Sequence, residues 1–165
     1  MAFEDESWAE LLSKIWRAWY LKGKQLKIPS PGKNKRVNIF ITLPFVRRKT
    51  LVYSLHNRRT YKELIYHFKK VMKFARKRSF KKIIIFFDNV RVHTSKKFKE
   101  FLKKNKDFIK VYPLSKYSPN LNEVEVKVNK QIKRDVCSNW FHGDTCALKK
   151  NLRKYLNYYV KNLVE

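Results

Sequence analysis

The chain has 165 residues, and 40 lysines and arginines against 13 aspartates and glutamates give it a formal net charge of +27 at pH 7. A field of this strength attracts polyanions, and 15% aromatic and 44% hydrophobic residues exclude a disordered basic tail. This length fits one domain with a single core. Nucleic acid is the expected partner, in preference to a solvated basic surface that reflects only heavy lysine usage.

The sequence also argues against a secreted, membrane or disulfide-stabilised protein. Acids and a tryptophan occupy the first residues, where a secretory signal would be basic and then apolar, so we expect an intracellular protein. The longest apolar run, residues 83–87, has the length of a strand and not of a membrane span. Cys137 and Cys146 could bind a metal together with His142, but ordinary thiols in a reducing compartment are the preferred interpretation.

The N-terminal segment predicts a short strand that ends at Asp5, followed by a tryptophan-rich segment. We interpret Trp8, Trp16 and Trp19 as core-packing residues and not as base-stacking residues. A basic turn follows at residues 29–35. This arrangement predicts a carboxylate at the end of the first strand.

A hairpin and a helix are expected next. Apolar residues alternate with period two over 37–43, and a charged turn at 47–49 leads to a return strand, which predicts antiparallel pairing. Thr60 and Glu63 form a capping box, and apolar residues then recur at helical spacing to about Arg78. The other face of this helix is lysine and arginine.

The apolar run at residues 83–87 shows no alternation, which is typical of a strand covered on both faces. It predicts a central strand with Asp88 at its carboxyl end. Thr94 or Ser95 can cap a second helix, and residues 109–112 supply another strand.

Two helices are predicted in the last third of the chain. Asn122 is a suitable N-cap for the first of them, and Glu125 lies beside its apolar stripe; the second begins near Asp144. The order of elements indicates a mixed α/β fold. Since ligand sites in such sheets favour the carboxyl ends of strands, Asp5 and Asp88 could meet if their strands are adjacent and parallel.

Asp5, Asp88 and Glu125 are acids in a very basic chain, and carboxylates of this kind can share two Mg²⁺ ions for phosphoryl transfer. The sequence has no glycine-rich phosphate-binding loop, and such chemistry needs no catalytic triad. Each acid also has a plain interpretation. Asp88 could form an Asx turn, Glu125 and Glu123 could favour a helix dipole, and Asp5 could belong to a solvated terminus.

Three segments carry a family resemblance. They are Phe3-Glu4-Asp5-Glu6-Ser7, the pair Asp88-Asn89 with His93 shortly after, and Tyr117-Ser118-Pro119-Asn120-Leu121-Asn122 leading to Glu125. In order and content they resemble the catalytic domain of insertion-sequence transposases of the mariner superfamily, over residues 3 to 135. These are DDE enzymes, and the resemblance implies a ribonuclease H-like α/β fold, a mixed sheet flanked by helices, as one domain over residues 1–165.

The resemblance implies that Asp5, Asp88 and Glu125 bind two Mg²⁺ or Mn²⁺ ions, cut the ends of a transposon and join them to target DNA. The motif selects Glu125, with 36 residues between it and Asp88, while a spacing of 34 intervening residues selects Glu123 as the alternative third ligand. The residues expected to contact DNA are His93, Arg91, Lys116, Lys127 and Lys130.

The chain also departs from the family pattern. Ser115-Lys116 stands in place of a proline pair, Glu123 in place of a proline, and Val128 in place of a tryptophan. These changes leave open an inactive remnant that acts only as a basic DNA-binding protein, and a ribonuclease H-like nuclease acting on RNA or branched DNA is a third hypothesis. Upstream helix-turn-helix modules are expected to be absent. The family further implies a possible homodimer in the cytoplasm or nucleoid of a prokaryote.

Overall fold

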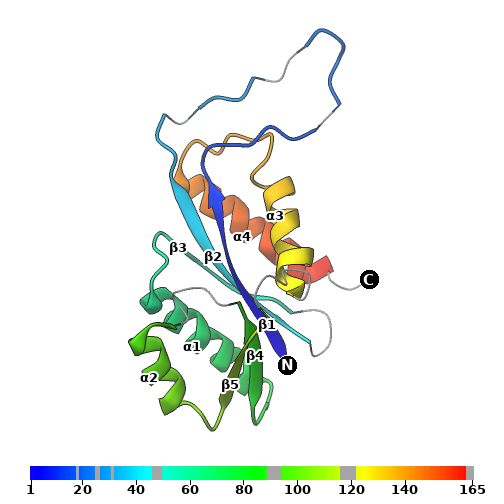
Figure 1. The fold of residues 1–165 in the computed structure, drawn as a ribbon. Helices are drawn as coiled ribbons and strands as arrows, with labels where there is room; N and C mark the ends of the chain where they lie inside the picture. The colour runs from blue at the N-terminus through cyan, green and yellow to red at the C-terminus, as the bar shows by residue number, and fades with distance from the viewer. Residues whose placement is uncertain are drawn as a thin grey trace.

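The structure is a computed structural model that describes residues 1–17, 19–24, 27–30, 32–45, 50–88, 94–115 and 122–162. One five-stranded sheet runs through it in the order β3-β2-β1-β4-β5 (Figure 1). The strands are β1 (Ala2–Glu10), β2 (Arg36–Pro44), β3 (Val52–His56), β4 (Ile83–Phe87) and β5 (Ile109–Pro113). The helices are α1 (Tyr61–Lys77), α2 (Lys96–Lys104), the π-helical turn η3 (Glu125–Asn129), α3 (Lys130–Asp135) and α4 (Thr145–Asn162).

The sheet is mixed. β1 pairs antiparallel with β2 along nine residues and parallel with β4 at Ala2 and Phe3, while β2 with β3 is antiparallel and β4 with β5 is parallel. The predicted hairpin is therefore confirmed. Residues 83–87 form β4, an interior strand between β1 and β5 as predicted, although the middle strand of the five is β1.

The predicted end of the first strand is wrong. β1 continues to Glu10, so Asp5 lies in the middle of a strand and not at its end. Acidic residues are poor strand formers by themselves, so Glu4, Asp5, Glu6 and Glu10 would not favour a long strand on local preference alone. The continuous ladder with β2 overrides that preference.

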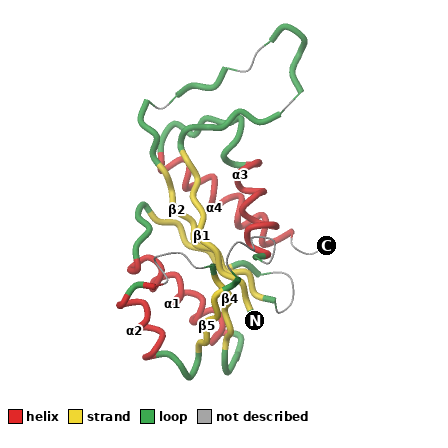
Figure 2. Tube along the Cα trace, in the orientation of Figure 1, coloured by secondary structure: helices red, strands yellow, loops and turns green. Residues whose placement is uncertain are grey.

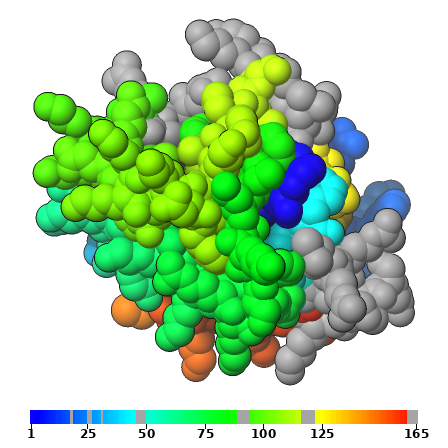
Figure 3. Space-filling view, turned by 90° about the horizontal axis from the view of Figure 1, so that it is seen from below, coloured from blue at the N-terminus to red at the C-terminus, as the bar shows by residue number. Residues whose placement is uncertain are grey.

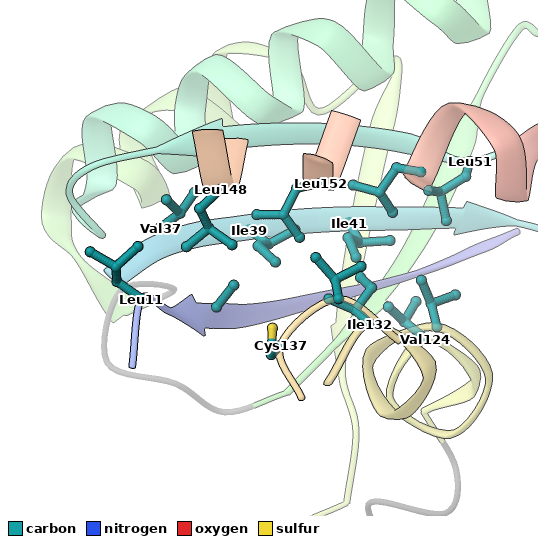
Figure 4. Packing of buried hydrophobic residues seen from close by; sticks show 14 residues of the cluster. Leu11, Val37, Ile39, Ile41, Leu51, Val124, Ile132, Cys137, Leu148 and Leu152 are labelled. Carbon is teal, nitrogen blue, oxygen red and sulfur yellow. The ribbon is translucent and has the colours of Figure 1, made fainter. Parts of the chain in front are cut away.

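Helices cover both faces of the sheet, α1 and α2 on one and α3 and α4 on the other (Figures 1 and 2). On the α4 face, Leu148 and Leu152 pack against β2 (Figure 4). The predicted stripe of the third helix belongs to this core, since Val124, Val128 and Ile132 are fully buried. On the α1 face, buried side chains of α1 and α2 form a second core.

The outer surfaces of α1 and α2 are basic. Figure 3 views the molecule from the end where these helices and β4 and β5 lie. The exposed cations of the two helices are Lys62, Lys69, Lys70, Lys73, Arg76, Lys77, Lys96, Lys97, Lys99, Lys103 and Lys104. This is the surface that a polyanion would meet on that side of the protein. Among the described residues, no helix combines the length and apolar character that a membrane crossing requires.

The capping box predicted for α1 is present. Thr60 Oγ1 accepts a hydrogen bond from the Lys62 amide, and the Glu63 carboxylate accepts one from the Thr60 amide. We expect Thr60→Ala to cost about 1 kcal/mol, which lowers the Tm by roughly 2–4 °C. Thermal unfolding followed by circular dichroism measures this, with Ser30→Ala, an exposed hydroxyl outside every helix and strand, as the control. An unchanged Tm would contradict the stabilising role of the cap.

The core-packing interpretation of the tryptophans is wrong. Trp8, Trp16 and Trp19 are exposed residues, at 40%, 57% and 103%. The hydrogen bond from the Leu11 amide to the Lys35 carbonyl closes the end of the β1–β2 ladder. The described parts of the segment between these residues extend away from the sheet as an arm (Figure 1). Trp16 and Trp19 belong to that arm and so cannot reach the core.

Candidate active site

Asp5 lies on the face of β1 that α3 and α4 cover. Phe3, two residues earlier on the same face, packs against the core formed with α4, and Ile41 stands opposite Asp5 on β2. Asp5 is a buried residue, 5% exposed. A carboxylate is thereby held at the centre of the sheet, next to apolar side chains that cannot solvate it.

Asp88 follows β4, the parallel neighbour of β1. Phe3 pairs with Phe86, and two further residues along each strand lead to Asp5 and Asp88. The two acids therefore occupy equivalent positions on neighbouring parallel strands. The expectation that their strands are adjacent and parallel is confirmed, although only Asp88 follows a strand end.

Asn122 attaches the start of the third helical segment to β1. Its side-chain amide donates to the Glu4 carbonyl at 3.4 Å, and its Oδ1 accepts from the Val124 amide at 3.2 Å. The Glu125 amide donates to the Asn122 carbonyl. These bonds confirm the predicted helix start at Asn122 and hold the first turn, with Glu125, beside the backbone that carries Asp5.

The acids influence one another electrostatically. Burial raises the pKa of the Asp5 carboxyl from 3.8 to about 8. The negative charges of Glu4, Asp88 and Glu125 act in the same direction, while a backbone hydrogen bond at Glu6 opposes them. A carboxylate this costly to ionise is a feature of functional sites, because a bound cation would reverse its energetics.

Asn129 completes the surroundings of Asp5, and the sequence analysis missed it. Its side-chain amide donates to Asp5 Oδ2, and its own Oδ1 is buried with no hydrogen-bond partner among the described residues. The signal was present in the sequence, because Asn129 directly follows Val128 within the apolar stripe and stands four residues after Glu125. A polar residue there needs a polar partner, and Asp5 is that partner.

Glu123 and Glu125 have different surroundings. The Glu123 carboxylate forms a 2.8 Å ion pair with Lys127 Nζ, and its charge is not among those that raise the pKa of Asp5. Lys127 and Lys130 are exposed on η3 and at the start of α3. The other residues expected to contact DNA, Arg91, His93 and Lys116, lie outside the described residues, as does Tyr117-Ser118-Pro119-Asn120-Leu121.

Within the described ranges, no three His, Cys, Asp or Glu side chains are grouped closely enough to hold a metal ion as they stand. Asp88 and Glu125 lie near enough to Asp5 for their charges to raise its pKa, although the three do not form a ready metal site. For the alternative cysteine site, Cys137 is a buried free thiol and Cys146 an exposed one. Both ring nitrogens of His142 are already hydrogen-bonded, to the Val136 carbonyl and to Asn151.

The geometry agrees with a known family. The family model for the DDE superfamily endonuclease matches residues 1–149. The chain belongs to this family. Among curated proteins, the chain is 30% identical over 124 residues to the insertion element IS630 uncharacterized 39 kDa protein of Shigella sonnei, a match that covers 74% of this chain and 35% of that protein.

Solved structures of a transposase share the fold of this DDE family member. The mariner Mos1 paired end complex with Mg has a TM-score of 0.73 at 13% identity and covers 99% of this chain and 49% of that one. The catalytic domain of Mos1 mariner transposase has a TM-score of 0.66 at 14% identity and covers 99% and 71%. The predicted ribonuclease H-like mixed sheet flanked by helices is confirmed. The chain spans about a third of the length of its curated relative.

Proposed function

We propose that residues 1–165 form the catalytic domain of an insertion-sequence transposase, which cuts DNA at transposon ends and joins those ends to target DNA. The observation that carries the proposal is the electrostatic coupling of Asp5 to Asp88 and Glu125, from two neighbouring strands and a helix start. Membership of the DDE superfamily endonuclease family supports it. Acids without a function would lie at the protein surface, where water solvates them. Asp5 is instead buried beside other acids.

The donor set fits Mg²⁺ or Mn²⁺. Hard divalent cations prefer carboxylate oxygens, and Asp5, Asp88 and Glu125 would hold them, with Glu123 as the alternative third ligand. Relatives of the same fold were solved as complexes with Mg and with Mn. A pair of such ions supplies charge neutralisation and an activated nucleophile for in-line displacement at phosphorus. We propose two ions by analogy with this chemistry.

The chain's own residues would prepare that reaction. Asn129 holds the Asp5 carboxylate in one orientation, and Asn122 fixes the helix start that carries Glu125. The exposed Lys127 and Lys130 would contact the DNA backbone beside the acids, together with Arg91, His93 and Lys116. Orientation of the acids and attachment of the DNA thus come from adjacent turns of one helical segment.

The proposed partners are transposon ends and target DNA. Relatives of the same fold were solved as a paired-end complex with a transposon end and as a strand transfer complex. A homodimer that holds two ends is proposed by the same likeness. The insertion element of Shigella sonnei supports action in the cytoplasm or nucleoid of a prokaryote.

Metal-dependent DNA cleavage tests the proposal. Supercoiled plasmid and pre-cut duplexes with the ends of the element are incubated with the protein in Mg²⁺, in Mn²⁺ or in EDTA, and nicked and joined products are separated on gels. We expect products only with a divalent ion. Salt-sensitive binding to every DNA substrate with no products would instead favour the inactive DNA-binding remnant. Preferential cleavage of RNA or branched DNA would favour the other nuclease.

Asn129→Ala separates orientation of Asp5 from metal binding itself. Loss of a residue that orients a metal ligand typically costs about 10- to 100-fold in metal affinity or activity. We therefore expect the cleavage rate to fall by that factor at low Mg²⁺ and to recover partly as Mg²⁺ is raised, measured as a Mg²⁺ titration of the rate. Val126→Ala, an exposed change on the same turn, is the matched control. Identical titrations for Asn129→Ala and the wild type would contradict the role of Asn129.

A further inference from the structure

Two segments more than 120 residues apart are joined side by side at the base of the arm. The Lys14 amide donates to the Cys137 carbonyl at 3.2 Å, and the Asn139 amide donates to the Lys14 carbonyl at 3.0 Å. Figure 1 shows the chain after α3 passing beside the start of the arm. Each segment thus both donates a hydrogen bond to the other and accepts one from it, which fixes the position of the two segments at this junction.

Side chains reinforce this junction and set two tryptophans beside it. The Trp16 amide donates to Asn139 Oδ1 at 2.8 Å, and the Trp140 amide donates to Ser13 Oγ at 3.1 Å. Asn139 has a φ of 57°, a left-handed conformation that asparagine tolerates. Trp16 and Trp140 are 57% and 62% exposed although hydrogen bonds fix their backbones. Two large indole rings are thus presented to solvent from an ordered support.

Each tryptophan lines a hollow in the surface. The hollow of about 180 Å³ is lined by Trp8 and Trp16 together with Lys14 and Lys133. The hollow of about 520 Å³ is lined by Trp140, Lys154, Tyr155 and Tyr158. Ser138 lines both, so the two hollows adjoin across the junction. We call them together the aromatic–lysine surface.

The charges of this surface favour an anionic ligand. Lys133 Nζ lies 5.9 Å from the centroid of the Trp8 ring. Two acids also line the hollows. Asp135 binds the Arg134 guanidinium at 2.6 Å, which offsets its charge, while Glu10 accepts from the neutral Trp8 indole and keeps its negative charge. Lys14, Lys133 and Lys154 outnumber the two acids, so the lining of the two hollows carries a net positive charge.

We propose that the aromatic–lysine surface binds single-stranded DNA, with unpaired bases on Trp16 and Trp140 and phosphates on the lysines. Flat exposed rings interleaved with lysine are how proteins bind single strands, since any base offers a face for stacking. A duplex hides those faces within its own stack. The inference goes beyond the proposed reaction and does not need it, because this surface lies at the opposite end of the helical segment from Glu125.

Fluorescence anisotropy of a labelled oligothymidine, longer than the roughly 4–16 nucleotides that such a site covers, tests the proposal. EDTA in the buffer removes any contribution from metal-dependent cleavage. We expect single-stranded DNA to bind more tightly than a blunt duplex with the same number of phosphates. Trp16→Ala and Trp140→Ala should each weaken single-strand binding by about 5- to 150-fold, the factor for stacking of one base, and leave duplex binding unchanged.

Trp19→Ala is the matched control, because Trp19 is fully exposed and lines neither hollow. It should bind single strands like the wild type, and Trp16→Phe, which keeps an aromatic face, should retain most of the affinity. Circular dichroism establishes that the variants are folded. Unchanged single-strand binding in both alanine variants overturns the proposal, as does an equal loss for Trp19→Ala. A dimer that dissociates in these variants while single-strand affinity is kept also overturns it, because a second copy would then cover the surface.

Discussion

Asp5→Asn should lower the rate of metal-dependent DNA cleavage by about 10³-fold or more. The change keeps the size of the side chain and the acceptor for the Asn129 amide, but it removes the negative charge that a divalent ion requires. Loss of about 4 kcal/mol of transition-state stabilisation corresponds to that factor. Single-turnover cleavage at saturating Mn²⁺ measures it, and Asp88→Asn should behave in the same way.

Glu123→Gln is the matched control for this prediction. Its carboxylate pairs with Lys127 on the helix surface, so cleavage should stay close to the wild-type rate. Glu125→Gln should be as inactive as Asp5→Asn. The reverse result for the two glutamates would make Glu123 the third ligand. A fully active Asp5→Asn protein would show that the reaction does not occur at these acids.

The same substitution should have the opposite effect on stability. The pKa of Asp5 is about 8 in the folded protein against 3.8 ordinarily, because burial and neighbouring acids oppose ionisation. Below pH 4 the residue is protonated in both states. Between pH 4 and 8 the unfolded chain releases a proton that the folded chain retains, so the free energy of unfolding falls as the pH rises and levels off above about 8. The total is on the order of 5 kcal/mol.

Urea unfolding in EDTA at pH 5, 7 and 9 measures this effect. We expect the wild type to lose stability with pH more steeply than Asp5→Asn, and the variant to be the more stable of the two at pH 9. Glu100→Gln, an exposed acid on α2, should follow the wild-type curve. Parallel curves for the wild type and Asp5→Asn would mean that Asp5 ionises normally in the fold.

Local patterns predicted the helices and the hairpin well. The capping box of α1, the caps at Ser95 and Asn122, and the stripe from Val124 to Ile132 depend on residues within a few positions of one another. Such features are encoded by periodicity and capping chemistry, which act over one or two turns. The alignment of Asp88 with Asp5 also followed, because parallel neighbouring strands bring equivalent positions together.

Pairing partners and burial were less accessible to sequence reasoning. β1 extends to Glu10 because β2, more than 25 residues later, supplies a partner for every residue. The position of the Trp16 backbone depends on a hydrogen bond to Asn139, and the position of Asn129 depends on a strand at the other end of the chain. Each of these is a long-range contact, which composition and periodicity do not report.

The way in which β1 and β2 pair at the base of the arm has a consequence for engineering the protein. The ladder continues to the pair Glu10–Arg36, and the Leu11–Lys35 bond follows it, so the sheet is complete without the arm. Closure of a loop depends only weakly on its length. The outer part of the arm, beyond Trp16, should therefore tolerate deletion or exchange with little effect on the geometry around Asp5. The domain thus offers an insertion site for foreign sequence at the tip of its longest hairpin.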